Sequence, residues 1–72
     1  MTEERLSLRE VEVLEMVARG LTNNQIAEEL GVTVHGVKFH LAAVYRKLGV
    51  SNRTAAAGVY LRAAHGRAEV AT

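Results

Sequence analysis

Residues 22–41, TNNQIAEELGVTVHGVKFHL, contain two helix beginnings separated by a glycine, and this arrangement decides the fold. Thr22 and Gln25 have the spacing of a capping box, in which the threonine hydroxyl accepts from an early amide while the glutamine reaches back. Gly31 follows the last apolar residue of the first helix and is suited to the left-handed conformation that ends a helix. Thr33 can cap a second helix only two residues later. The stretch therefore predicts two helices joined by a very short turn.

The turn is too short for these two helices to lie antiparallel along their full length, so we expect them to cross steeply. The crossing needs a small side chain, which Ala27 supplies, and a residue tolerant of positive φ, which Gly31 supplies. Val32 and Val37 then fill the angle between the helices. This spacing is typical of a helix-turn-helix, although ordinary helical hairpins also show it.

A further helix is predicted on the N-terminal side of this motif. Ser7 and Glu10 form another capping box, and the helix runs to about Arg19, with Gly20 as its stop. Its inner face is formed by apolar residues at helical spacing, namely Val11, Leu14, Val17 and Ala18.

Helix signals also mark the C-terminal half of the chain. The helix that Thr33 caps runs to Leu48 and stops at Gly49. Ser51 can cap a fourth helix, which we expect to end near Gly66.

The length and composition are those of one small domain that no covalent link stabilises. The chain has 72 residues and no cysteine, so packed aliphatic side chains and capped helices must hold it together. No strand pattern is present, and we predict an all-α four-helix bundle with a central helix-turn-helix over residues 6–66, with flexible ends at 1–5 and 67–72. Since the sequence shows neither a signal peptide nor an apolar run that spans a bilayer, we expect a soluble cytoplasmic protein, associated with the nucleoid when bound to DNA.

The charges are unequally distributed along the chain. Residues 1–29 contain seven acids and three bases, a net charge of −4, whereas residues 30–72 contain six bases and one acid, a net charge of +5. No carboxylate occurs between Leu30 and Ala68. A cationic half without acids indicates a polyanionic partner, with chance clustering in a short chain as the alternative.

The third predicted helix, residues 34–48, carries its only phenylalanine on the side away from its apolar stripe. With Val37 set at zero and about 100° for each residue, the apolar residues within about 80° are Val34, Leu41, Val44, Tyr45 and Leu48. Phe39 falls at about 200°, and Arg46 at about 180°. Phe39 is either a solvated surface residue or part of a face that meets a partner, as in a helix whose side chains contact DNA bases in the major groove.

Ordered motifs along most of the chain resemble a known family. They are L-S-x-R-E-x-E-V-L, V-A-x-G-L-T-N-x-x-I-A-x-x-L, V-K-x-H-L and Y-R-K-L-G-V-x-N-R-T. From about Leu6 to Leu61 the chain resembles the LuxR-type DNA-binding domain of bacterial response regulators and quorum-sensing regulators. The resemblance implies sequence-specific binding of double-stranded DNA, with the third helix in the major groove, by a homodimer that reads two half-sites.

The resemblance also assigns individual DNA contacts. The base-reading positions fall on Lys38, Phe39 and Ala42, and we add His35 from the same face. The phosphate contacts fall on Thr22, Asn23, His40, Lys47 and Arg53, and we add Thr33, Arg46 and Thr54.

At four positions the chain departs from the family pattern. Asn24 and Gln25 stand where relatives often carry a glutamate and a basic residue, and Gly36 stands where threonine is usual. Ala42 cannot donate a hydrogen bond to a base. These departures leave the domain type secure, whereas the preferred DNA sequence is not indicated.

The fourth predicted helix is apolar on two sides. One stripe consists of Ala55, Ala56, Val59 and Ala63, and the other of Ala57, Tyr60, Leu61 and Ala64. We expect one stripe to close the core and assign the second to a homodimer interface, as the resemblance implies. The alternative is an alanine-rich surface helix without a partner.

The two alternatives to DNA binding are an enzyme or metal protein and a protein-interaction module. An enzyme or metal protein is disfavoured, because His35 and His40 lie about 140° apart on one helix and no cysteine or nearby acid accompanies them. We therefore predict no catalytic residue, metal, cofactor or small-molecule ligand. A helix-turn-helix module that contacts a protein such as RNA polymerase, without DNA specificity of its own, remains the alternative. The sequence does not indicate the target promoter, activation or repression, or an upstream sensor domain.

Overall fold

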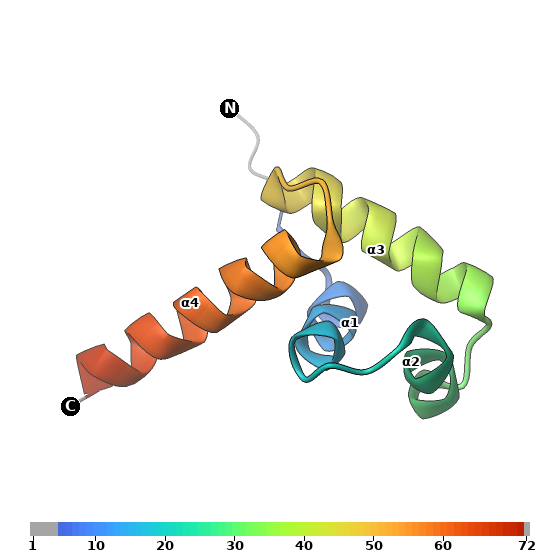
Figure 1. Ribbon diagram of the computed structural model, residues 1–72, viewed down its shortest axis with the longest axis horizontal. Helices are drawn as coiled ribbons and strands as arrows, with labels where there is room; N and C mark the ends of the chain where they lie inside the picture. The colour runs from blue at the N-terminus through green and yellow to red at the C-terminus, as the bar shows by residue number, and fades with distance from the viewer. Residues whose placement is uncertain (1–4, 72) are drawn as a thin grey trace.

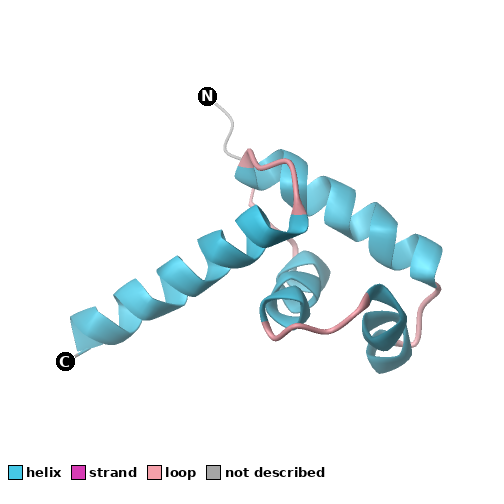
Figure 2. Cartoon of the chain, viewed as in Figure 1, coloured by secondary structure: helices cyan, strands magenta, loops and turns pink. Residues whose placement is uncertain are grey.

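Four helices joined by short loops form the domain (Figures 1 and 2). The computed structural model describes residues 5–71, with side chains described for residues 5–64. The helices are α1 (Leu8–Ala18), α2 (Asn23–Leu30), α3 (Val34–Leu48) and α4 (Arg53–Ala71). No strand occurs within residues 5–71, so the predicted all-α fold is confirmed. Of the flexible ends predicted for residues 1–5 and 67–72, residues 1–4 and Thr72 lie outside the described residues.

The first three helices begin at the predicted capping residues. The Ser7 hydroxyl accepts from the Glu10 amide at 3.1 Å, while Glu10 Oε1 accepts from the Ser7 amide at 2.9 Å. Thr22 and Gln25 form the same reciprocal pair, at 3.1 Å and 2.8 Å. The Thr33 hydroxyl accepts from the amide three residues later at 3.0 Å. These bonds satisfy backbone donors that have no partner within the helix, and they fix where each helix starts.

The fourth helix begins and ends at residues other than those predicted. Asn52 caps it instead of Ser51, since Asn52 Oδ1 accepts from the Ala55 amide at 2.8 Å. At the other end α4 continues through Gly66 to Ala71. A glycine inside a helix costs about 1 kcal/mol relative to alanine, but it ends the helix only where it adopts the left-handed conformation.

The core consists of two clusters that share α1 and α3. The larger cluster joins α1, α2 and α3 through Val13, Val17, Ile26, Ala27, Val37 and Leu41. The smaller cluster joins α1, α3 and α4 through Leu14, Val44 and Ala56. Both clusters draw on the apolar stripe predicted for α3, which is therefore confirmed as its core face.

The buried face of α1 is rotated by about one residue from the predicted one. Val13 is fully buried, whereas Val11, which we placed on the inner face, is 39% exposed. The buried positions 10, 13, 14 and 17 have ordinary helical spacing, but the first of them is occupied by Glu10. Because an acid occupies one position of the buried stripe, the apolar residues alone predicted a different face of α1.

The turn between α2 and α3 has the predicted geometry. Gly31 adopts a left-handed conformation with φ of 68°, and the Val32 amide donates to the Ala27 carbonyl at 3.0 Å. Figure 1 shows α2 nearly end-on where α3 runs across the view, so the two helices cross steeply. Ala27 and Val37 are both buried at this crossing. One face of α3 is therefore buried in the core.

A partly buried ion pair joins the beginning of α1 to the end of α3. Lys47 Nζ donates to Glu10 Oε1 at 2.9 Å and to the Arg5 carbonyl at 3.2 Å. The two side chains are only 17% and 10% exposed, so solvent screens the pair weakly. The hydrogen bonds from Lys47 and from the Ser7 amide hold the pKa of the Glu10 carboxyl below its ordinary value of 4.5.

The substitution Glu10→Gln should destabilise the domain by about 1–3 kcal/mol at neutral pH, because it leaves the partly buried ammonium without its carboxylate. Since the folded-state pKa is lowered, the stabilisation by Glu10 is complete above the ordinary pKa and is lost as pH falls through the lowered value. Urea unfolding of both proteins should therefore show a difference in stability that shrinks in acid. The control Glu12→Gln breaks an exposed pair with Arg9 and should change stability by less than about 0.5 kcal/mol. A Glu10→Gln protein as stable as this control would contradict the assigned role.

Candidate nucleic-acid interface

The outer face of α3 presents the residues that we assigned to base reading. Phe39 is 70% exposed, so the predicted outward orientation of its ring is confirmed. The other predicted base-reading residues, His35, Lys38 and Ala42, are exposed as well. Arg46, which we assigned to phosphate binding, is also exposed. The ring of Phe39 meets that of His40 edge-on, with centroids 5.8 Å apart. An aromatic surface flanked by cations therefore lies opposite the core stripe.

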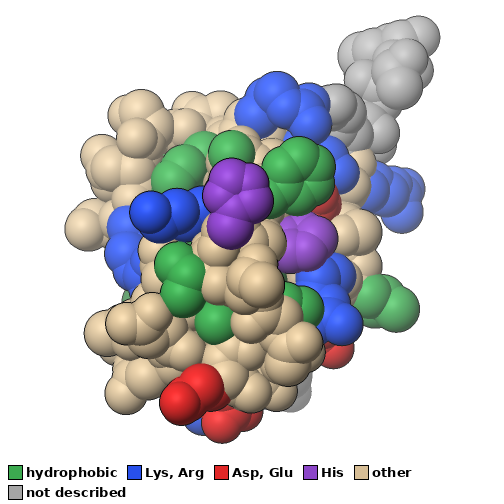
Figure 3. Space-filling view, turned by 90° about the vertical axis from the view of Figure 1, so that its right-hand side faces the viewer, with side chains coloured by type: hydrophobic (Ala, Val, Ile, Leu, Met, Phe, Trp, Pro, Cys, Tyr) green, Lys and Arg blue, Asp and Glu red, His purple; other side chains and the backbone are tan. Residues whose placement is uncertain are grey.

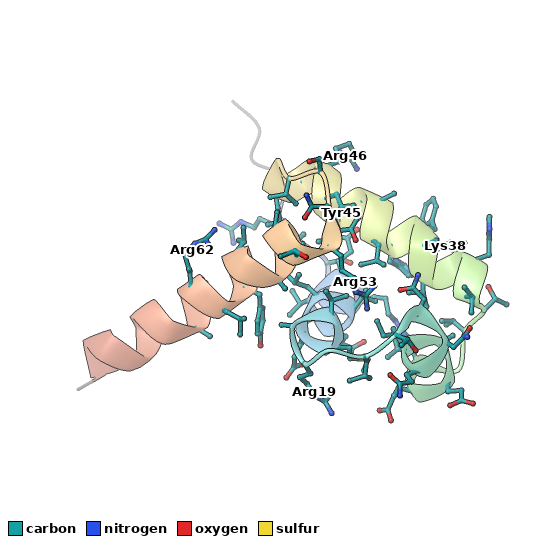
Figure 4. The ribbon with its side chains drawn as sticks, viewed as in Figure 1. Arg19, Lys38, Tyr45, Arg46, Arg53 and Arg62 are labelled. Atoms are coloured by element: carbon teal, nitrogen blue, oxygen red, sulfur yellow. The ribbon has the colours of Figure 1, made fainter. Side chains whose placement is uncertain are left out.

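The charges on this side of the molecule are segregated. Figure 3 shows histidine side chains beside hydrophobic and basic ones, with most of the acids at the lower edge of the face. In Figure 4, Lys38 and Arg46 lie toward opposite ends of α3. Eight residues of helix separate them by about 12 Å, so they can meet different phosphates of one strand.

An open groove of about 530 Å³ brings together residues from three helices. Four of its lining residues belong to the predicted phosphate-binding or base-reading sets, namely Thr22, Asn23, Lys38 and Arg53. The others are Gly20, Leu21, Asn24 and Val34. The lining includes an ammonium, a guanidinium, amides and a hydroxyl but no carboxylate, which suits a phosphate oxygen. Asn24 was not among the predicted site residues, and only the fold brings it to this groove.

Lys47 and Arg53, both predicted to bind phosphates, have partners within the domain. Lys47 is paired with Glu10, as described above. Arg53 Nη1 donates to Asn23 Oδ1 at 2.8 Å, and Arg53 Nη2 donates to the Leu21 carbonyl. In Figure 4, Arg53 lies where the beginning of α4 approaches the other helices, and its side chain is half-buried at the groove. The sequence motif gave no sign of these pairings, because the partners lie 37 and 30 residues away.

The remaining predicted contact residues are spread over the surface. Thr33 and Thr54 are exposed, and His40 is half-buried on α3. The Thr33 hydroxyl serves as the cap of α3, so its oxygen already accepts one hydrogen bond. None of these three side chains lines the groove.

The residues assigned to a dimer interface divide between the core and the surface. Ala57 and Tyr60 pack against the two core clusters, whereas Leu61 is 53% exposed and Ala64 is exposed. The expected division into one core stripe and one free stripe is therefore wrong. Ala56 and Tyr60 come from different predicted stripes yet face the same cluster, because α4 contacts α1 and α3 at once.

The described part of the chain shows neither a metal cluster nor a spanning helix. No group of three or more His, Cys, Asp or Glu residues is placed to hold a metal ion among the described residues. No helix among them combines the length and the apolar character that crossing a bilayer requires.

The fold and the outward face of α3 define a DNA-binding helix-turn-helix domain. The model of the family of bacterial regulatory proteins named luxR matches residues 4–60, so the chain belongs to this family. The resemblance noted from the sequence motifs is thereby confirmed. Because the family and the relatives below are transcriptional regulators, the prediction that the chain is not an enzyme is confirmed as well.

Similar proteins are regulators of greater length. The chain is 47% identical over 62 residues to the transcriptional regulatory protein LiaR of Bacillus subtilis, covering 86% of this chain and 29% of that protein. It is 42% identical over 57 residues to the nitrate/nitrite response regulator protein NarP of Escherichia coli, covering 79% and 26%. The crystal structure of the response regulator ChrA of a heme-sensing two-component system matches with a TM-score of 0.76 at 44% identity, covering 86% and 32%. The chain thus spans less than a third of these relatives.

The glycine in the N-terminal half of α3 is not required by the fold. A Cβ added at Gly36 would meet only Thr33 Oγ1 at 3.4 Å and Val32 Cβ at 3.9 Å, and the residue has no positive φ. We expect Gly36→Ala to stabilise the domain by about 0.5–1 kcal/mol, raising Tm by several degrees. The control Gly49→Ala, at a φ of 70°, should lower Tm because alanine is strained there. Thermal unfolding followed by circular dichroism measures both, and a lower Tm for Gly36→Ala would show that this glycine serves the fold.

Proposed function

We propose that this chain binds double-stranded DNA in a sequence-specific manner, with α3 in the major groove. The observation that carries the proposal is the 70% exposure of Phe39 beside Lys38, on a helix whose opposite side is buried in the core. A helix fits the major groove, which is about 12 Å wide, and an apolar side chain there can contact a thymine methyl group. Lys38 can donate to guanine O6 or N7, while the exposed His35 and Ala42 border the same surface.

The backbone contacts in this proposal come from the ends of helices and from cations around α3. Arg46 lies on the exposed side of α3, and Thr33 and Thr54 stand exposed near the beginnings of α3 and α4. Thr22 and Asn23 border the groove beside Lys38. Such contacts fix the register of the protein on the duplex but read no sequence.

We further propose that the chain acts as a homodimer in the bacterial cytoplasm and reads two half-sites. The exposed Leu61 and Ala64 on α4 support a contact between two copies, since α4 extends away from the other helices (Figure 1). Contact with RNA polymerase is the second protein interaction that we propose for a regulator of this class.

The dependence of binding on salt tests DNA binding against the alternative of a protein-interaction module. The logarithm of the affinity for duplex should fall with the logarithm of salt concentration, with a slope of about −0.9 for each phosphate neutralised. Fluorescence anisotropy with random-sequence duplexes at several salt concentrations measures this slope. No binding to duplex at low salt would favour the interaction module.

The variant Phe39→Ala should lose about 1–3 kcal/mol of affinity for the preferred duplex and little for random DNA. The preferred duplex is first obtained by selection from a random pool. Because the ring is exposed, folding stability should not change. The matched control is Leu8→Ala, which truncates an exposed apolar side chain that belongs to α1 instead of α3. Equal losses for Phe39→Ala on preferred and random duplexes would refute base reading by this ring.

Leu61→Asp should weaken the dimer, since it places a charge in the proposed contact. Binding to a duplex with two half-sites should lose cooperativity, while binding to a single half-site should be retained. The control Leu8→Asp adds the same charge to another exposed leucine and should preserve cooperativity. Sedimentation and titration of both duplexes measure these effects, and unchanged cooperativity in Leu61→Asp would exclude this surface as the interface.

A further inference from the structure

The guanidinium of Arg53 links the beginning of α4 to the beginning of α2. Its Nη1 donates to Asn23 Oδ1 at 2.8 Å, and its Nη2 donates to the carbonyl of Leu21 in the preceding loop. Arg53 is the first residue of α4, and Asn23 is the first residue of α2. The planar arginine fork therefore fixes the amide plane of Asn23 against the loop.

An asparagine amide has one acceptor oxygen and one amino group with two donors. At Asn23 the oxygen is occupied by Arg53, which leaves Nδ2 as the polar group still able to donate. No hydrogen bond from this amino group to another described residue is present in residues 5–64. Asn23 lines the open groove, and Lys38 lines it from α3.

We propose that Arg53 is a positioning residue at the DNA surface and that Asn23 Nδ2 donates to a backbone phosphate in the groove beside Lys38. The inference rests on the proposed DNA binding. Arg53 selects the orientation of the amide, because an amide turned by 180° would set Nδ2 against the guanidinium donors. A phosphate oxygen is an acceptor only, and it fits the amino group and the ammonium that remain.

This assignment changes the role that the sequence motif implied for Arg53. The guanidinium is half-buried, and both of its terminal nitrogens already donate within the domain. One N–H of each terminal nitrogen makes these two bonds, and together they hold the guanidinium plane against Asn23 and the loop. Arg53 thus acts through Asn23, and lysine cannot replace it, because one ammonium does not reproduce the fork that spans both acceptors.

A double-mutant cycle with Asn23→Ala and Arg53→Lys distinguishes an Arg53 that positions Asn23 from an Arg53 that contacts the phosphate directly. The probe is a mixture of random-sequence duplexes, because phosphate contacts do not depend on sequence. Asn23→Ala should weaken binding by about tenfold and leave the salt slope unchanged, because the amide carries no charge. Arg53→Lys should weaken binding in the wild-type background but cause no further loss in the Asn23→Ala background. Additive losses would show that Arg53 contacts the phosphate itself and would overturn the inference.

Asn23→Asp provides a test that does not depend on destabilising the fold. The carboxylate keeps the acceptor for Arg53 and stands at the first position of α2, where a negative charge favours the helix, so Tm should be unchanged or raised. Duplex binding should fall by much more than in the control Asn24→Asp, which adds the same charge at the next groove residue. Equal losses in the two variants would overturn the donor role of Asn23.

The side-chain amide signals of Asn23 give a direct readout by NMR. They should move when duplex is added to the wild-type protein and move much less in Arg53→Lys, although both proteins are folded. Amide signals that stay fixed in the wild type, while the signals of Lys38 move, would overturn the phosphate contact at Asn23. Failure of the wild-type protein to bind any duplex at low salt would instead overturn the proposed DNA binding, and this inference with it.

Discussion

The close crossing of α2 and α3 is the constraint on which the rest of the structure depends. A single left-handed glycine turns the chain, and the Val32 amide returns to the Ala27 carbonyl. Val37 is then buried in one cluster with Ala27, and α1 completes this cluster with Val13 and Val17. Once Val37 faces inward, helical geometry turns Phe39 outward, since the two residues lie about 200° apart around the axis. The fold and the exposed face of α3 therefore have one cause.

Local signals in the sequence predicted the first three helices and the orientation of α3. Capping boxes and glycine stops act within a few residues, so they can be read without knowledge of the fold. The core face of α1 was harder to predict from the sequence, because Glu10 occupies a buried position that an apolar residue normally fills. The ammonium of Lys47, 37 residues away, and the Ser7 amide make that acid compatible with burial. At α4 the predicted cap, Ser51, was wrong by one residue, because the Asn52 side chain accepts the hydrogen bond from the Ala55 amide.

The basic residues around α3 and α4 fall into two groups that the sequence did not distinguish. Lys38 is exposed on α3, whereas Lys47 and Arg53 hold the domain together through contacts to α1, α2 and the loop before α2. Adjacent residues such as Arg46 and Lys47 differ in exposure because they lie about 100° apart on the helix. A count of cations therefore overstates the charge that this surface offers to a phosphate backbone. In the groove beside Lys38, the hydrogen-bond donors that line it describe the surface better than its net charge does.

The bond from Lys47 to the Arg5 carbonyl defines where the folding unit starts. The ammonium is held by one side chain and by one backbone oxygen that precedes the first helix, so its site includes residues outside any regular element. A fragment cut immediately before Ser7 would retain all four helices yet leave the lysine with an incomplete set of acceptors. A fusion or truncation whose junction lies upstream of that carbonyl keeps both acceptors of the ammonium.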